Sequence, residues 1–176
     1  MRSLRSLVIA ALMSALSVIL TRFGSIRISI GAVEGIRLGI GALPYILTGI
    51  VLGPIYGALA GGIADLVGFF LSPIGGYMPH FTLTAALIGA IPGTVFRLLQ
   101  RGSRNTAQLL PLFCGIGAST VLVSWGLTPY FLHTLFGLDL RVIMVPRIVA
   151  GLVELPVYAF IVRAVYDRTR PLLRDR

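Results

Sequence analysis

Two acidic side chains lie within long apolar stretches, where a carboxylate is expected to be functional because burying it is costly. Asp65 and Glu154 are the only acids there, and Arg147 precedes Glu154 by seven residues. That spacing places Arg147 and Glu154 on one helix face, with the glutamate about 10 Å deeper, and Asp65 is expected at a similar depth. An arginine above carboxylates suits an elongated ligand with an acidic tail and a head group that donates hydrogen bonds. Alternatively, each acid only pairs with an arginine or caps a break in a helix.

Arginines also gather at one edge of the apolar stretches. Five of them are expected on the side of the membrane opposite the two termini: Arg22, Arg27, Arg37, Arg141 and Arg147. Each alone is explained by a side chain that reaches the lipid headgroups. Together they predict an electropositive outer mouth that would attract an anionic ligand.

Aromatic side chains accompany these charges. Residues 72–82, before the fourth apolar stretch, contain two prolines, two glycines, Tyr77 and Phe81, which predicts a stiff turn with exposed ring faces. Trp125, Tyr130 and Phe131 add aromatic faces near the outer end of the fifth stretch. The alternative for all of them is an aromatic belt at the membrane surface.

Catalytic and metal-binding patterns are missing from the sequence. His80 and His133 are the only histidines, and neither a His-Glu-x-x-His nor a Gly-x-Ser-x-Gly pattern occurs. All 15 basic residues are arginines, so a P-loop lysine and a Schiff-base lysine are excluded. We therefore expect no catalytic residues, no metal and no cofactor.

Composition identifies the elements that must position these side chains. The 176 residues are 56% hydrophobic and only 12% charged, with a mean hydropathy of +0.94. A soluble domain is about 25% charged, so a soluble enzyme, a nucleic-acid binder and a disordered chain are excluded. Six stretches approach the roughly 20 apolar residues that a membrane-spanning helix needs: residues 7–21, 38–52, 54–71, 81–99, 109–131 and 142–165. We predict an all-α integral membrane protein with six transmembrane helices in one domain, residues 1–176.

Charge and small residues predict how these helices are arranged. With the N-terminus cytoplasmic, ten arginines fall inside and five outside, which satisfies the positive-inside rule with both termini in the cytoplasm. Glycines spaced by four predict close helix contacts in lipid: Gly31, Gly35 and Gly39; Gly49, Gly53, Gly57 and Gly61; and Gly89 and Gly93. Ala11 and Ala15 repeat that spacing on the first helix, where they could form a docking face for another membrane protein.

Three segments resemble the folate-specific S components of energy-coupling-factor (ECF) transporters. They are residues 75–93 (GGYMPHFTLTAALIGAIPG), 36–44 (IRLGIGALP) and 52–59 (LGPIYGAL). Six spans, small size and a cytoplasmic N-terminus fit the same family, and the resemblance runs over nearly the whole chain. It implies an S-component bundle in the plasma membrane of a prokaryote. Such a subunit would capture folate outside and release it inside when docked to a coupling membrane subunit and two ATPase subunits.

The resemblance and the patterns above together predict a set of functional residues. Ligand contacts are expected from Arg37, Asp65, Tyr77, Pro79, Phe81, Thr82, Trp125, Phe131, Arg147 and Glu154. In such proteins an Ala-x-x-x-Ala on the first span contacts the coupling subunit, which Ala11 and Ala15 match. Three alternatives remain open: an S component for another vitamin, a solo proton-coupled carrier of an anionic small molecule, and a small membrane enzyme that acts on lipid.

Overall fold

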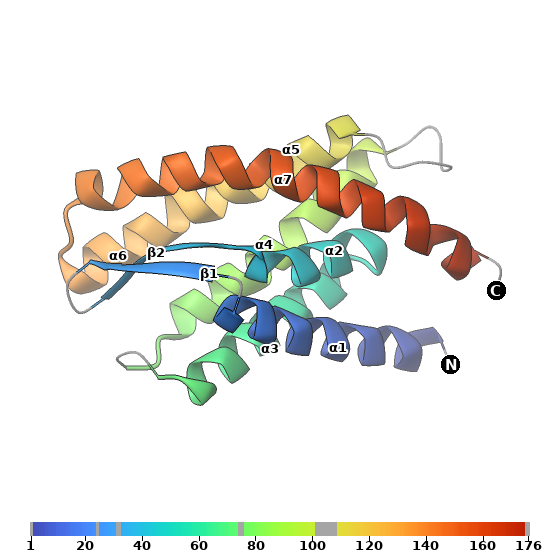
Figure 1. Cartoon of the computed structure of the whole chain (residues 1–176), viewed down its shortest axis with the longest axis horizontal. Coiled ribbons are helices and arrows are strands. Elements are labelled where there is room, and N and C mark those ends of the chain that lie inside the picture. The colour runs from blue at the N-terminus through green and yellow to red at the C-terminus, as the bar shows by residue number, and fades with distance from the viewer. Residues whose placement is uncertain (1, 24, 31–32, 74–75, 101–108, 175–176) are drawn as a thin grey trace.

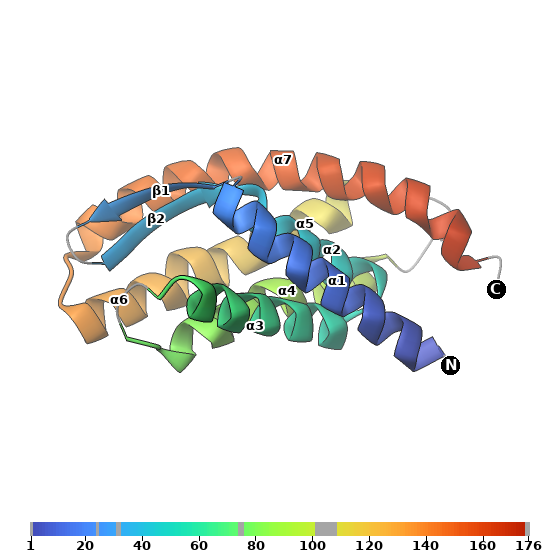
Figure 2. The same cartoon turned by 60° about the horizontal axis from the view of Figure 1, so that its bottom comes forward.

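The protein is a bundle of apolar helices with one β-hairpin at the end opposite the two termini (Figures 1 and 2). The computed structural model describes residues 2–23, 25–30, 33–73, 76–100 and 109–174. The elements in chain order are α1 (Arg2–Phe23), β1 (Ser25–Ile30), β2 (Val33–Gly39), the 3-10 helix η1 (Ile40–Ala42), α2 (Leu43–Val51), α3 (Pro54–Leu71), α4 (Pro79–Leu99), α5 (Leu109–Ser119), the π-helix η2 (Thr120–Leu127), α6 (Thr128–Phe136) and α7 (Leu140–Arg174).

Six apolar helical segments match the six predicted spans. Among the described residues, five helices are long and apolar enough to cross a membrane: Leu4–Phe23, Pro54–Leu71, Pro79–Leu99, Leu109–Phe136 and Leu140–Arg168. The sixth, Ile40–Val51, is shorter. It ends where Gly53 adopts φ 126°, a conformation that suits glycine, and Pro54 then starts α3 at a position where a missing N–H costs nothing. The prediction of an all-α membrane bundle is confirmed, and the hairpin is an addition to it.

The hairpin occupies a segment that we expected to be an outer loop and the start of the second span. β1 and β2 pair antiparallel, with Arg27 opposite Arg37 and a bulge after Ile28. The alternation of isoleucine with serine or arginine along β1 is a strand pattern. Because β1 is short and lies between two long apolar stretches, this pattern did not lead to a predicted strand.

One glycine prediction is therefore wrong. Gly35 and Gly39 lie in β2, so the spacing that begins at Gly31 is not a helix-packing pattern, and Gly31 itself lies outside the described residues. In a strand, residues four apart share a face but have no helical groove to form. Four-residue spacing of glycine alone does not distinguish the two structures.

Most of the remaining glycines do bring helices into contact, as predicted, whereas Gly53 lies between α2 and α3 and faces the Arg97 side chain. A Cβ atom at Gly57 would lie 2.3 Å from the Gly89 carbonyl oxygen, and one at Gly93 would lie 2.1 Å from the Gly49 oxygen. A real Cβ atom cannot lie this close to an oxygen, so only glycine fits at these positions. The backbones of α2, α3 and α4 therefore touch directly. This is the packing by which small residues hold helices together in lipid.

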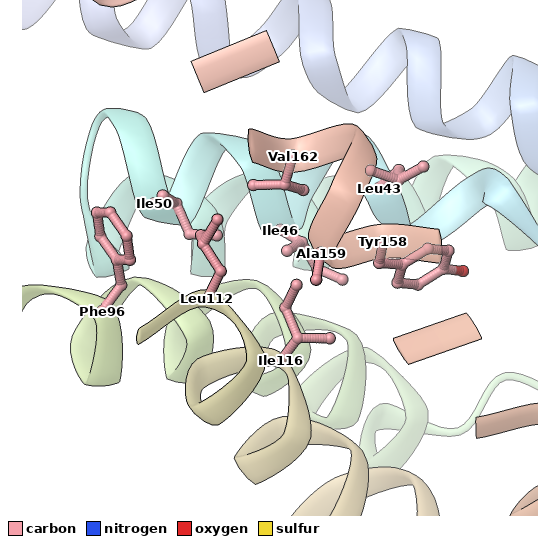
Figure 3. Close-up of a cluster of buried hydrophobic side chains, with 9 residues drawn as sticks. All are labelled: Leu43, Ile46, Ile50, Phe96, Leu112, Ile116, Tyr158, Ala159 and Val162. Atoms are coloured by element: carbon pink, nitrogen blue, oxygen red, sulfur yellow. The ribbon is translucent and has the colours of Figure 1, made fainter. Parts of the chain in front are cut away.

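A cluster of buried apolar side chains joins α2, α4, α5 and α7 (Figure 3). Its members are Leu43, Ile46, Ile50, Phe96, Leu112, Ile116, Tyr158, Ala159 and Val162. The Tyr158 ring belongs to the cluster, but its hydroxyl points away from it (Figure 3). The cluster fixes the middle of α7 against α2, and the cavity described next begins beside it.

Candidate functional site

A cavity of about 380 Å³ lies among the helices, in the half of the bundle away from the termini. Its lining comes from the last turns of α1 and α3, the first turns of α4, the start of α2, the α5–η2–α6 helix and the first half of α7. This volume falls within the range of about 300–1,000 Å³ that is typical of small-molecule sites. The cavity is therefore large enough for a vitamin-sized ligand.

Two acids and two arginines line this cavity: Asp65, Glu154, Arg22 and Arg147. Arg22 stands in the last turn of α1, and Arg147 stands two helical turns nearer the outer end of α7 than Glu154. The predicted arrangement of arginine above carboxylate is thus present in one cavity. A ligand with an anionic end and a hydrogen-bond-donating end would find a partner for each.

Asp65 is oriented by a short chain of hydrogen bonds. The Thr82 hydroxyl donates to Asp65 Oδ2 at 2.7 Å, and the Tyr77 hydroxyl lies 2.9 Å from Thr82 Oγ1. Asp65 and Tyr77 line the cavity, whereas Thr82 does not. In this arrangement Thr82 supports the carboxylate and joins α3 to α4 at the outer end.

Glu154 and Tyr158 hold the end of the hairpin on α7. The Gly39 N–H donates to Glu154 Oε1 at 3.1 Å, and the Tyr158 hydroxyl donates to the Gly39 carbonyl oxygen. The two side chains are one helical turn apart, so together they satisfy both backbone groups of Gly39. Glu154 thus has a structural hydrogen bond, but to the end of a strand and not to the arginine or the helix break that the sequence left open as alternatives. Tyr158 was not anticipated, because nothing in the sequence links it to residue 39.

Arg22 is a cavity residue that the predicted ligand set did not include. Its Nη2 atom donates to the Gly68 carbonyl oxygen at 2.5 Å and ties the end of α1 to the end of α3. Its membership of the five outer arginines was the signal that could have added it to the set. Its guanidinium carries further donors that can face a ligand in the cavity.

The aromatic lining differs from the predicted one. Tyr45, Phe69, Tyr77, Phe81 and Phe136 line the cavity, and the Tyr77 ring packs against Phe69 with centroids 5.3 Å apart. Trp125 and Phe131 are not among the lining residues. The Phe131 ring lies 4.8 Å from the His80 ring, and the Trp125 indole bonds to α7. Pro79 begins α4 and also lies outside the lining.

A row of hydroxyl groups follows the π-helix along one wall. Thr120, Ser124 and Thr128 all line the cavity. The Thr120 hydroxyl donates to Ile116 O at 3.0 Å and that of Thr128 donates to Val123 O at 2.9 Å. Within the described part of the chain the Ser124 hydroxyl has no hydrogen-bond partner. π-Helical turns occur frequently at functional sites, and no pattern in the sequence announced this one.

One predicted ligand residue is placed only by its backbone. Arg37 lies in β2, opposite Arg27. The position of its side chain lies outside the described part of the structure.

Ala11 and Ala15 are both exposed on α1. Neighbouring positions face inward instead: Ser14 donates to Ala60 O at 3.1 Å, and Ser17 donates to Gly41 O at 2.6 Å. The two alanines therefore form a shallow strip on the outside of the bundle. This placement is the one that a helix-docking face requires.

Among the described residues, no group of three or more His, Cys, Asp or Glu side chains could hold a metal ion.

Comparisons with known proteins agree on one family. A family model described as "ECF-type riboflavin transporter, S component" matches residues 1–166. The chain is 30% identical over 162 residues to the "Folate transporter FolT" of Clostridium novyi (strain NT), covering 92% of this chain and 88% of that protein. It is also similar to the crystal structure of FolT bound with folic acid, with a TM-score of 0.71 and 26% identity over 89% of this chain and 88% of that one.

Proposed function

This chain belongs to the family of S components of ECF-type transporters, and from that premise we propose that it captures folate at the outer face of the membrane. An S component is a transport subunit and not an enzyme. The site described above is then a binding site, and its task is to hold a vitamin until the rest of the transporter releases it on the other side.

The observation that carries the proposal is the pairing of charges in the cavity. Folate has a pterin head with an amino group that donates hydrogen bonds, and a glutamate tail with two carboxylates. Arg22 and Arg147 would receive the tail, and Asp65 or Glu154 would accept from the head. Charge-assisted hydrogen bonds of this kind are about twice as strong as neutral ones. The rings of Phe69, Tyr77 and Phe81 offer apolar faces for the flat part of the ligand.

Riboflavin is the second candidate, because the matching family model carries its name. Riboflavin has no carboxylate, so Arg22 and Arg147 would face a ligand without a negative charge to offset theirs. The 30% identical relative and the similar crystal structure both name folate. We therefore place folate first.

Calorimetric titration of the purified protein in detergent tests this assignment. We expect folate to bind and riboflavin not to bind. Arg147→Ala should weaken folate binding by about tenfold or more, because a hydrogen bond to a charged group contributes about 1.5–3 kcal/mol. Arg141→Ala is the matched control, since Arg141 is an exposed arginine on the same helix that does not line the cavity. Riboflavin binding without folate binding would overturn the proposal.

We propose further that Ala11 and Ala15 dock the coupling membrane subunit. That subunit would in turn bind two ATPase subunits, and the whole transporter would lie in the plasma membrane of a prokaryote. The exposed alanine strip supports this role. Two small residues one turn apart let another helix approach the backbone closely. The ATP hydrolysis that drives transport would have to take place in partner subunits, because the chain has no lysine for a P-loop.

Bulky substitution separates docking from ligand binding. Ala15→Trp should bind folate like the parent in detergent but should fail to support ATP-dependent uptake in liposomes with the partner subunits. Leu152→Trp is the control, because Leu152 is exposed on α7 and lies outside the cavity lining. Lost folate binding in Ala15→Trp, or uptake at the parent rate, would show that the docking face lies elsewhere.

A further inference from the structure

In the part of the chain that the structure describes, the polar contact of Trp125 reaches the helix turn that carries Arg147. The indole Nε1 donates to the backbone carbonyl oxygen of Arg147 at 3.1 Å. Trp125 stands on η2 and does not line the cavity, whereas Arg147 stands on α7 and does. The bond therefore links the wall behind the cavity to the backbone of a residue within it.

The Trp125 indole also lies close to the backbone of α7 at Gly151. A Cβ atom at Gly151, one turn after Arg147, would lie 2.9 Å from Trp125 Nε1 and 2.9 Å from Thr120 Cγ2. Only a glycine lets α7 approach η2 this closely. The indole N–H thus lies between the Arg147 carbonyl and the Gly151 backbone, with little room to move.

Two neighbouring residues of the π-helix lie on different sides of this wall. Ser124 lines the cavity, while the next residue, Trp125, contacts α7. In a membrane an indole N–H has no water to replace a lost partner, so it keeps the protein acceptor that it has. The bond to Arg147 is therefore a durable constraint on this turn of α7.

We propose that Trp125 is a positioning residue for the acidic end of the ligand, through its hydrogen bond to the backbone of Arg147. This inference rests on the proposed function, in which Arg147 receives a folate carboxylate. An arginine side chain is long, and its guanidinium binds a carboxylate well only when the groups that carry it are fixed. Trp125 fixes the height and rotation of the turn from which that side chain extends.

The competing explanation is that the Trp125 ring only packs between the helices. Packing alone would affect every ligand equally and would not depend on Arg147. We therefore compare folate with 6-methylpterin, which keeps the pterin head of folate and has no carboxylate. We also combine the tryptophan substitution with Arg147→Ala, because coupling between two residues appears as non-additive free energies.

Trp125→Phe keeps an aromatic ring and removes the N–H donor. We expect its folate affinity to fall by about three- to tenfold, the range of one lost hydrogen bond. Affinity for 6-methylpterin should change by less than about twofold, and Trp125→Phe should add no further loss in the Arg147→Ala background. Equal losses for folate and 6-methylpterin, or fully additive losses in the double variant, would overturn the inference.

A second variant tests the same contact if Trp125→Phe does not fold. Gly151→Ala puts a methyl group against the indole from the α7 side, and it should likewise weaken folate binding more than 6-methylpterin binding. Gly117→Ala is its control, because a Cβ there meets only Leu155 Cδ1, at an ordinary 3.5 Å. If Arg147→Ala weakens folate binding but Trp125→Phe and Gly151→Ala leave it intact, this inference is refuted and the proposed function still stands. A parent protein that does not bind folate would refute the proposed function as well.

Discussion

The contact between α3 and α4 provides a direct test of how the fold supports the cavity. A Cβ atom at Gly89 would lie 2.1 Å from the Gly57 carbonyl oxygen. Close C···O contacts between helices are about 3.3–3.6 Å, so Gly89→Ala requires the two backbones to separate by about 1.2 Å. No flexible side chain can absorb this shift, because the atom in the way belongs to the backbone.

The cost of that separation follows from packing. A gap of about 0.5–1 Å already loses a quarter to a half of the dispersion attraction between the atoms that line it. Overpacked positions lower the free energy of unfolding by about 1–3 kcal/mol, and we expect Gly89→Ala to fall in this range. Asp65 on α3 and Phe81 on α4 line the cavity from these same helices. Folate affinity should therefore fall too, by about two- to tenfold, as if one hydrogen bond were lost.

Thermal unfolding in detergent and folate titration measure both effects. Gly62→Ala is the matched control, because a Cβ there would meet its nearest atoms at 3.9 Å. Replacing an unhindered helical glycine by alanine ordinarily stabilises a helix by about 0.5–1 kcal/mol. We therefore expect opposite signs for the two variants. If Gly89→Ala has the same melting temperature as Gly62→Ala and binds folate like the parent, the backbone contact is refuted.

Further predictions concern the polar groups of the cavity. Folate binding to Asp65→Asn and Glu154→Gln should each be measured by calorimetry. We expect the variant that replaces the acid accepting from the pterin to bind folate about tenfold or more weakly. Unchanged affinity in both variants would leave these acids with structural roles only. Tyr158→Phe removes the donor to the Gly39 carbonyl and should lower the free energy of unfolding by about 0.6–1.7 kcal/mol, the range of hydrogen bonds within membrane proteins. Tyr130→Phe, at an exposed tyrosine, should melt like the parent; equal melting of both variants would argue against the Tyr158 bond.

Segment-level features of this protein could be predicted from the sequence because they depend on local properties. A helix in a membrane must satisfy its own backbone groups, so each span has to be apolar over its own length. Residues 54–71 and 81–99 accordingly match α3 and α4 closely. Arg147 and Glu154 lie in one cavity because seven residues on one helix keep them on the same face.

The hairpin was missed because its pattern is short and its strands pair only with each other. Strand β1 has six residues, which is too few to stand out between two apolar helices. Its pairing with β2 depends on a turn and a register that composition does not encode. The end of β2 is then held by Glu154 and Tyr158, which lie more than one hundred residues further along the chain.

Contacts between elements were decided by the tertiary structure alone. Whether Trp125 faces the cavity or α7 depends on the rotation of η2, and a π-helical turn changes that rotation by one residue. Thr82 supports Asp65 because glycine contacts bring α3 close to α4, and Arg22 reaches Gly68 because α1 packs against α3. The sequence determines which segments cross the membrane, because that depends on the chemistry of each segment alone. Which side chains meet depends on how closely and at what rotation the helices pack, and that is a property of the whole bundle.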